Sequence, residues 1–199
     1  NKVPSRLKED PGLIYERMRW RRKAKLPTAA QFLYDPPDNI TNVRNWWINS
    51  RIVVRRLINK KKFSDAYNIL NNHKLPLTEE SGREAEWLAG WVALHHLNKK
   101  KESIIHFTKV FENTKDENMK AKAAYWIAMS NNSLNEKTHE KKWLSIAAKN
   151  KFSFYGQNAS IKIGNFKVPS RKVLLVKPEG FDELFDVIKI ILKSGQNTE

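Results

Sequence analysis

Apolar residues recur at spacings of three and four through most of the chain, whereas the alternating pattern of strands is nearly absent. This period is typical of amphipathic helices. Glycine, which often ends helices, occurs only seven times in 199 residues. The pattern predicts helices over residues 10–25, 43–59, 64–72, 82–97, 101–113, 115–133 and 137–149, with a short helix after Pro27 and Thr28. The chain is therefore predicted to be all-α.

Helix boundaries divide the chain into four parts. The stretch Tyr34–Asn39, "YDPPDN", cannot continue a helix, because two adjacent prolines remove two amide donors. We expect N-terminal helices over residues 1–40, a helical-hairpin repeat domain over 41–164, a linker over 165–179 and a C-terminal amphipathic helix over 180–199. Sequence signals for helix starts occur at three places, namely Asp10 followed by Pro11, and the capping-box spacings Ser81 with Glu84 and Thr114 with Glu117.

The predicted hairpins resemble one another. The pair Leu97-Asn98 recurs 37 residues later as Leu134-Asn135, and one apolar triplet occurs three times in corresponding helices, as Ala66/Ile69/Leu70, Phe107/Val110/Phe111 and Leu144/Ala147/Ala148. Short polar connections make consecutive helices antiparallel neighbours. Repeats of this length with two helices each are typical of helical solenoids. We therefore expect a superhelical array of antiparallel helical hairpins, an α-solenoid of the TPR-like kind with a concave side.

The chain is strongly basic, and the charge is unevenly placed. The formal net charge is +16, and residues 1–62 hold 16 basic and 5 acidic side chains. Such a field attracts polyanions, although it does not say which ones. The stretch Arg17–Lys23, "RMRWRRK", contributes much of it. Its basic residues spread around one helix, and three roles stay open for them: pairing with neighbouring helices or facing solvent, lining a groove for an anionic ligand, and nucleic-acid binding.

The sequence contains no motif of a known catalytic or cofactor site. Cysteine is absent, which excludes disulfides and thiolate chemistry. The five histidines include no pair spaced as zinc ligands around a glutamate, and no phosphate loop or nucleophile elbow occurs. We therefore assign no catalytic, cofactor-binding or metal-binding residues. No apolar run is long enough to span a bilayer and no signal peptide is present; because the chain begins at Asn1, we expect a processed or trimmed piece of a longer protein.

Tryptophans and arginines are the candidate binding residues. Trp87, Trp91 and Trp126 occupy helical spacings that favour burial between hairpins. Trp46 and Trp47 are adjacent and should point to different sides, so one of them is expected to be exposed. Because Arg51 and Arg55 are one helical turn apart, they can face the same groove. The candidate ligand-contacting residues are Arg21, Arg22, Trp47, Arg51 and Arg55.

Four blocks in unbroken order over residues 10–164 resemble the superhelical region of soluble lytic murein transglycosylases. They are "DPGLIYERMRWRRK" from Asp10, "EAEWLAGWVALHHL" from Glu84, "AKAAYWIAMS" from Ala121 and "FSFYGQNASIKIG" from Phe152. The resemblance implies a periplasmic ring or horseshoe of helical hairpins, whose parent protein cleaves peptidoglycan with a separate lysozyme-like domain. That domain needs a Glu-Ser pair followed by a glycine-rich run, and here "EES" at Glu79–Ser81 has no such run after it.

The resemblance therefore implies a non-catalytic scaffold that holds and orients peptidoglycan for an absent catalytic domain. Its expected partners are glycan strands and that lysozyme-like domain, and the candidate residues become candidate glycan contacts. Two other classes stay open, a helical-repeat adaptor that binds a partner protein and a nucleic-acid-binding protein. A nucleic-acid binder should lose affinity steeply with salt, whereas a peptide adaptor should show modest salt dependence.

Overall fold

The computed structural model describes Pro4 and residues 7–166, 186–187 and 189–190. Within these residues the secondary structure is helical and contains no strand. The prediction of an all-α chain is therefore confirmed. The elements are α1 (Pro11–Lys23), the 3-10 helix η2 (Pro27–Phe32), α2 (Val43–Asn59), α3 (Phe63–Asn71), α4 (Glu80–His96), α5 (Lys100–Glu112), α6 (Glu117–Ser133), α7 (Lys137–Ala147) and α8 (Phe154–Lys162).

The chain divides into two units, residues 1–167 and 168–199. In the second unit the four described residues are helical, and Lys189 Nζ lies 3.3 Å from Asp186 Oδ1. The linker predicted over 165–179 and the helix predicted over 180–199 otherwise lie outside the described residues. Among the helices of the described residues, none combines the length and the apolar character needed to cross a membrane.

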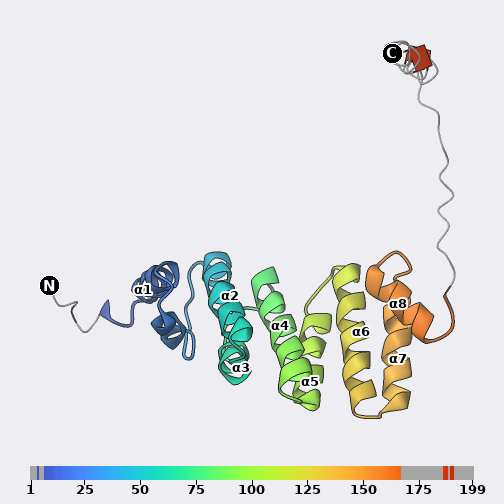
Figure 1. Cartoon of the computed structure of the whole chain (residues 1–199), viewed down its shortest axis with the longest axis horizontal. Helices are drawn as coiled ribbons and strands as arrows, with labels where there is room; N and C mark the ends of the chain where they lie inside the picture. Colours follow the sequence, from blue (N-terminus) through green and yellow to red (C-terminus); the bar gives the residue numbers. More distant parts are fainter. Residues whose placement is uncertain (1–3, 5–6, 167–185, 188, 191–199) are drawn as a thin grey trace, which may run out of the picture. The chain divides into compact units, whose positions relative to one another are not determined.

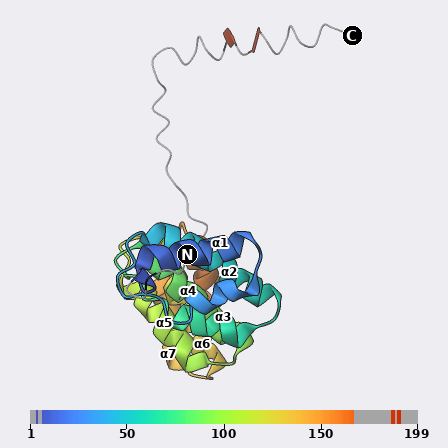
Figure 2. The same cartoon turned by 90° about the vertical axis from the view of Figure 1, so that its left-hand side faces the viewer.

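In the first unit, consecutive helices pack against one another in chain order (Figure 1). The pairs are α1 with η2, α2 with α3, α4 with α5, and α6 with α7, and in each the second helix returns alongside the first. The last helix, α8, packs on both α6 and α7. Figure 2 looks at the same unit from the side of α1, which lies in front of the later helices. The helical-repeat character predicted from the sequence is confirmed.

The repeated sequence elements occupy corresponding places in successive pairs. Ala66 of α3, Phe107 of α5 and Leu144 of α7 are all buried, as are the residues three positions later on each helix. Gly90 of α4 lets Phe107 approach, because an added Cβ would lie 2.8 Å from a carbon of its ring. Each second helix therefore buries the same stripe against its neighbours.

A common turn ends the first helix of three pairs. After α1, α2 and α6, the N–H of the second residue beyond the C-cap donates back to a carbonyl in the last turn, over 2.9–3.0 Å. This is the Schellman arrangement, which requires a left-handed residue at its centre. The left-handed residues are Lys25, Lys61 and Asn135, with φ of 58°, 58° and 62°. Asn98 after α4 is also left-handed, so both copies of Leu-Asn consist of a helix C-cap and a left-handed residue.

Both predicted capping boxes are wrong. The helix α4 begins at Glu80, so Ser81 lies inside its first turn and is buried. In the segment before α4, Arg83 Nη1 donates to the carbonyls of Leu77 and Thr78 at 2.9 and 2.7 Å. At α6, Asp116 is the N-cap and accepts from the Asn118 N–H, whereas Thr114 instead accepts from the Asp116 N–H. Asp10 caps α1 as predicted, accepting from Leu13 N–H at 2.8 Å.

The helix α8 was not predicted from the sequence. Ser153 is its N-cap and accepts from the Gly156 N–H at 3.0 Å. Gly156 is required here, because an added Cβ would lie 1.9 Å from the Asn150 carbonyl oxygen. A glycine in the first turn weakens the intrinsic helix propensity, and packing on α6 and α7 outweighs it.

The three tryptophans expected between hairpins lie there, although none is fully buried. Trp126 of α6 packs with His95 of α4 and Phe107 of α5, at centroid distances of 5.1 and 6.2 Å. Trp91 stacks on His95, and Trp87 receives Lys122 from α6 over its ring. Trp87 and Trp126 therefore bridge neighbouring pairs, whereas the ring contact of Trp91 is with its own helix.

Candidate functional site

An open groove lies between α2 and the start of α4, with a volume of about 550 Å³. We call it the α2–α4 groove. Its α2 wall carries two arginines and its α4 wall carries three glutamates, so opposite charges face one another. It is lined by Arg44, Trp47, Ile48 and Arg51 from α2, and by Glu79, Glu80, Ser81 and Glu84.

Glu84 connects the two walls of this groove. Its Oε2 accepts from Trp47 Nε1 at 2.5 Å and from Arg51 Nη1 at 3.0 Å. The side chains of Arg51 and Glu84 are 34% and 35% exposed, so solvent or a ligand can reach this ion pair.

A lysine of α6 also lies near α4. Lys122 Nζ is 3.6 Å from the centroid of the Trp87 ring. Burial lowers the pKa of Lys122, and the charge of Glu84 opposes that effect.

The expectation that one of Trp46 and Trp47 is exposed is wrong. Their exposures are 3% and 4%, because the apolar face of α2 is wide enough to include two adjacent positions. Trp46 packs near Tyr15 of α1, with ring centroids 6.2 Å apart. Trp47 lines the α2–α4 groove but directs its indole N–H to Glu84. It therefore positions Glu84, and its ring offers little open surface for a ligand to stack on.

The structure brings together two of the five predicted ligand-contacting residues, Trp47 and Arg51. Arg55 lies one turn further along α2 and is exposed. Arg21 of α1 instead places its guanidinium 4.9 Å from the centroid of Phe32. Arg22 is partly buried, and its carbonyl accepts from Arg56 Nη1 at 2.8 Å. The Arg21 side chain therefore connects α1 to η2, the first of the three roles considered for the basic stretch, whereas Arg22 contacts α2 through its backbone carbonyl.

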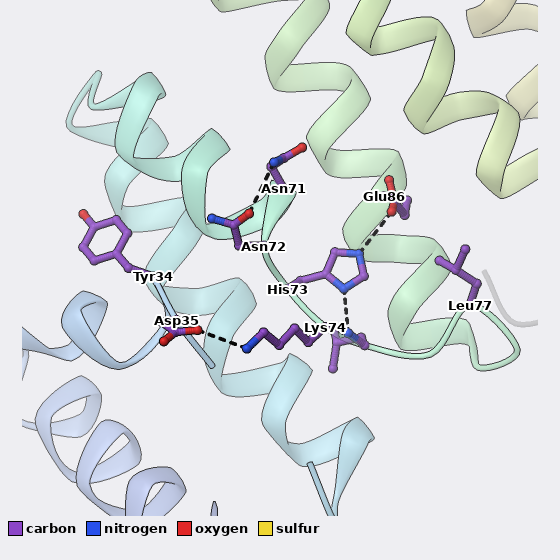
Figure 3. A pocket seen from close by; sticks show the side chains of 9 residues that line it. Tyr34, Asp35, Asn71, Asn72, His73, Lys74, Leu77 and Glu86 are labelled. Atoms are coloured by element: carbon purple, nitrogen blue, oxygen red, sulfur yellow. Dashed lines mark hydrogen bonds and ion pairs between the residues drawn. The ribbon is translucent and has the colours of Figure 1, made fainter. Parts of the chain in front are cut away.

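A second cavity, of about 670 Å³, lies on another side of α4 (Figure 3). We call it the α3–α4 pocket. Its lining comes from the loop after η2, from the end of α3 and the segment that follows it, and from α4, and it consists mostly of hydrogen-bonding groups. It is lined by Tyr34, Asp35, Asn71, Asn72, His73, Lys74, Leu75, Leu77 and Glu86.

Glu86 forms the deepest charged group of the α3–α4 pocket. Its side chain is 6% exposed and accepts from His106 Nδ1 of α5 at 2.5 Å and from Lys109 Nζ at 2.8 Å. His73 Nε2 lies 3.4 Å from its other side. Burial alone would raise the pKa of Glu86, but these three partners outweigh burial and hold it well below its usual range. Glu86 is therefore ionised at neutral pH and surrounded by donors.

The neighbouring hydrogen bonds fix the proton positions of both histidines in their neutral forms. The Leu75 N–H donates to His73 Nδ1 at 2.8 Å, so the proton of a neutral His73 sits on Nε2 and faces Glu86. His106 lies with Nε2 3.1 Å from the Tyr67 hydroxyl. Burial raises the pKa of Tyr67, and the nearby charges of Glu102 and Glu86 add to this, so its hydroxyl keeps a proton to donate. Every buried polar atom on Glu86 and His106 thus has a partner.

The rim of the α3–α4 pocket is held by a surface ion cluster. Lys74 is left-handed, with φ of 50°, and its Nζ lies 3.0 Å from Asp35 and 2.9 Å from Asp38. Hydrogen bonds to Asp38 and then Asp35 raise the pKa of Lys74. Both carboxylates are almost fully exposed, so this cluster orders the loop and adds little stability.

The residues around Glu86 were not predicted from the sequence, because the histidines were considered only as metal ligands. A signal was present: Glu86 stands among Ala85, Trp87, Leu88 and Ala89, an unusual place for an unpaired charge. Its partners come from positions 73, 106 and 109, and no local spacing links them. Within the described residues, no group of three or more acidic or histidine side chains is arranged to hold a metal ion.

Comparison with known proteins gives no relative for this chain. No protein-family model, no curated protein and no solved structure matches it.

Proposed function

We propose that the chain is the non-catalytic helical scaffold of a periplasmic lytic murein transglycosylase. In this proposal the hairpins form a superhelical α-solenoid, and its concave side holds and orients peptidoglycan for a lysozyme-like catalytic domain of the same protein. The proposal rests on the resemblance of the four sequence blocks and on the charges of the α2–α4 groove. No residue of the chain is assigned a catalytic role.

One observation carries the proposal, a row of three arginines along one face of α2. Arg44, Arg51 and Arg55 are separated by two turns and then one turn, so they share a side of the helix. Among the residues that the structure describes, the guanidinium groups of Arg44 and Arg55 have no ion pair or hydrogen bond. Peptidoglycan stem peptides carry carboxylates, and such a row attracts them.

The α4 wall of the same groove adds a second kind of contact. Glu79 and Glu80 are exposed and face the arginine side across the cavity. Stem peptides carry amino groups as well as carboxylates, so a groove with both signs of charge complements a zwitterionic chain better than a uniformly basic surface does. The ion pair of Arg51 with Glu84 can exchange partners, because each side chain is about one third exposed.

The test is sedimentation with purified sacculi. The double variant Arg44→Glu with Arg55→Glu should weaken binding about tenfold at 0.1 M salt, since two exposed ion contacts contribute up to about 1 kcal/mol each. Raising the salt to 1 M shortens the Debye length from about 10 Å to about 3 Å and should remove the difference. The control, Lys141→Glu with Lys142→Glu, makes the same charge change on exposed residues of α7.

The control distinguishes binding at the α2–α4 groove from attraction by the net charge of the whole chain. Equal losses for the two double variants would mean that net charge alone attracts the wall, and no groove would be needed. No loss for either would contradict the proposed function.

A second candidate is a protein-protein adaptor that binds a peptide in the same groove. It is favoured by the acidic wall, which a purely anionic ligand does not use. Binding that is modestly salt-dependent, saturated by peptide and absent with sacculi would support the adaptor over the scaffold.

A further inference from the structure

We propose that the α3–α4 pocket binds an uncharged N-acetylated sugar unit, separately from the α2–α4 groove. This inference deepens the proposed function and rests on it for the choice of a wall saccharide. Three properties of the pocket support it: its charge, its unused hydrogen-bonding groups and its rigidity.

The pocket is nearly neutral in a strongly basic chain. Its lining contains Asp35, Lys74 and Glu86, and the charged groups paired with them are Asp38 and Lys109. Three carboxylates and two ammonium groups leave a slight negative excess, although the chain as a whole carries +16. A carboxylate ligand would therefore be drawn to the arginine row of α2 rather than to this pocket, which favours an uncharged ligand.

The pocket also has unused hydrogen-bonding groups. Within the described part of the chain, neither the Tyr34 hydroxyl nor Asn71 Oδ1 has a hydrogen-bond partner. Asn72 uses only one of its two amide hydrogens, donating to Asn68 Oδ1 at 3.1 Å. Burial raises the pKa of Tyr34, with a smaller contribution from Asp65, so its hydroxyl can both donate and accept at neutral pH.

These groups match the chemistry of a sugar ring. Side-chain amides present a donor and an acceptor in one plane, which suits neighbouring hydroxyls and the N-acetyl amide of an amino sugar. The half-buried Tyr34 ring and the side chains of Leu75 and Leu77 supply apolar surface for the ring carbons. A volume of about 670 Å³ lies in the range of small-molecule sites.

The pocket walls are already fixed before a ligand enters. His73 is held between the Leu75 N–H and Glu86, and Glu86 is held by His106 and Lys109. On the rim, the ion cluster of Lys74 ties the loop after η2 to the segment after α3. A site whose groups are held in place loses less conformational entropy on binding, so even neutral hydrogen bonds can yield measurable affinity.

The experiment titrates the whole chain with tetra-N-acetylchitotetraose, an uncharged probe, followed by protein NMR chemical shifts. We expect one saturable site, with shift changes at residues of the α3–α4 pocket. The double variant Tyr34→Phe with Asn72→Ala should weaken binding about tenfold, the loss expected for two neutral hydrogen bonds. Because the probe is neutral, its affinity should change less than about twofold between 0.1 and 0.5 M salt.

The matched control is Asn113→Ala. Asn113 is the C-cap of α5 as Asn72 is the C-cap of α3, and each donates its side-chain amide within the preceding turn. This variant should bind like the wild type. Absence of saturable binding by the wild-type chain, or an equal loss in the control, would overturn the inference.

A second variant tests the pocket by filling it with a larger side chain. Asn71 is exposed at the pocket, so Asn71→Trp should block entry while circular dichroism reports an unchanged fold. Unchanged probe binding by this variant would overturn the inference. The two proposals fail separately. Sacculus binding that depends on the arginine row, without any chitotetraose binding, would overturn the pocket inference and leave the proposed function standing.

Discussion

Glu84 and Glu86 lie two positions apart on one helix, in opposite surroundings. At 100° per residue they point about 200° apart, Glu84 into the α2–α4 groove and Glu86 into the α3–α4 pocket. The Glu84 side chain is 35% exposed and has one arginine partner, whereas that of Glu86 is 6% exposed and has two histidines and a lysine around it. One carboxylate is available to exchange partners with a ligand, and the other is part of the core.

The contrast shows that one helix can carry an accessible charge on one side and a buried, structural charge on the other. A surface ion pair contributes little to stability, so its members can serve a ligand. A buried carboxylate must be fully satisfied, because any missing donor leaves an uncompensated charge in the interior. The two sides of α4 should therefore respond to mutation in different ways.

The largest expected effect is on the buried side. His106→Ala removes the closest donor to Glu86 and should lower the free energy of unfolding by about 3–5 kcal/mol. Arg51→Ala on the groove side should cost less than about 1 kcal/mol. Urea denaturation of both variants measures the contrast. Similar losses for the two would remove the distinction between a structural and an exchangeable carboxylate.

A second prediction concerns acid stability. The pKa of folded Glu86 lies below its ordinary value of 4.5, so its ionised form contributes stability above that pH and the contribution is lost as the pH falls below it. Wild-type chain should therefore lose more stability than Glu86→Gln between pH 5 and pH 3. Urea midpoints at the two pH values measure this difference. An equal loss in both proteins would contradict the assigned partners of Glu86.

The smallest effect is expected at the pocket rim. Lys74→Met breaks the ion pairs with Asp35 and Asp38, both almost fully exposed, and should leave the free energy of unfolding nearly unchanged. The same variant should weaken chitotetraose binding measurably, because the loop that carries Tyr34 loses its tether. A large loss of stability with unchanged chitotetraose binding would contradict this prediction, because it would give Lys74 the structural role assigned to the partners of Glu86.

Some helices were predictable because their signals are local. The helix over Val43–Asn59 was predicted with the correct bounds, since a proline break precedes it and its apolar residues keep a regular period. The repeated Leu-Asn pairs also marked corresponding turns correctly. In both cases neighbouring residues carry all the necessary information.

Features that depend on distant residues could not be predicted in the same way. At the start of α4, Arg83 reaches back to two carbonyls, and the burial of both Trp46 and Trp47 depends on packing against other helices. The α3–α4 pocket combines a loop after η2 with Asn71 and Glu86. Only the three-dimensional arrangement brings these groups together.

We propose that the arginine row of α2 binds carboxylates of the wall, and that the α3–α4 pocket binds sugars of the wall. The most direct test compares binding to intact sacculi with binding to sacculi whose stem peptides have been removed by an amidase. We predict that removal weakens the salt-sensitive part of binding and leaves a part that Tyr34→Phe with Asn72→Ala weakens about tenfold. Equal binding to both materials at 0.1 M salt, where exposed charges act over about 10 Å, would contradict the claim.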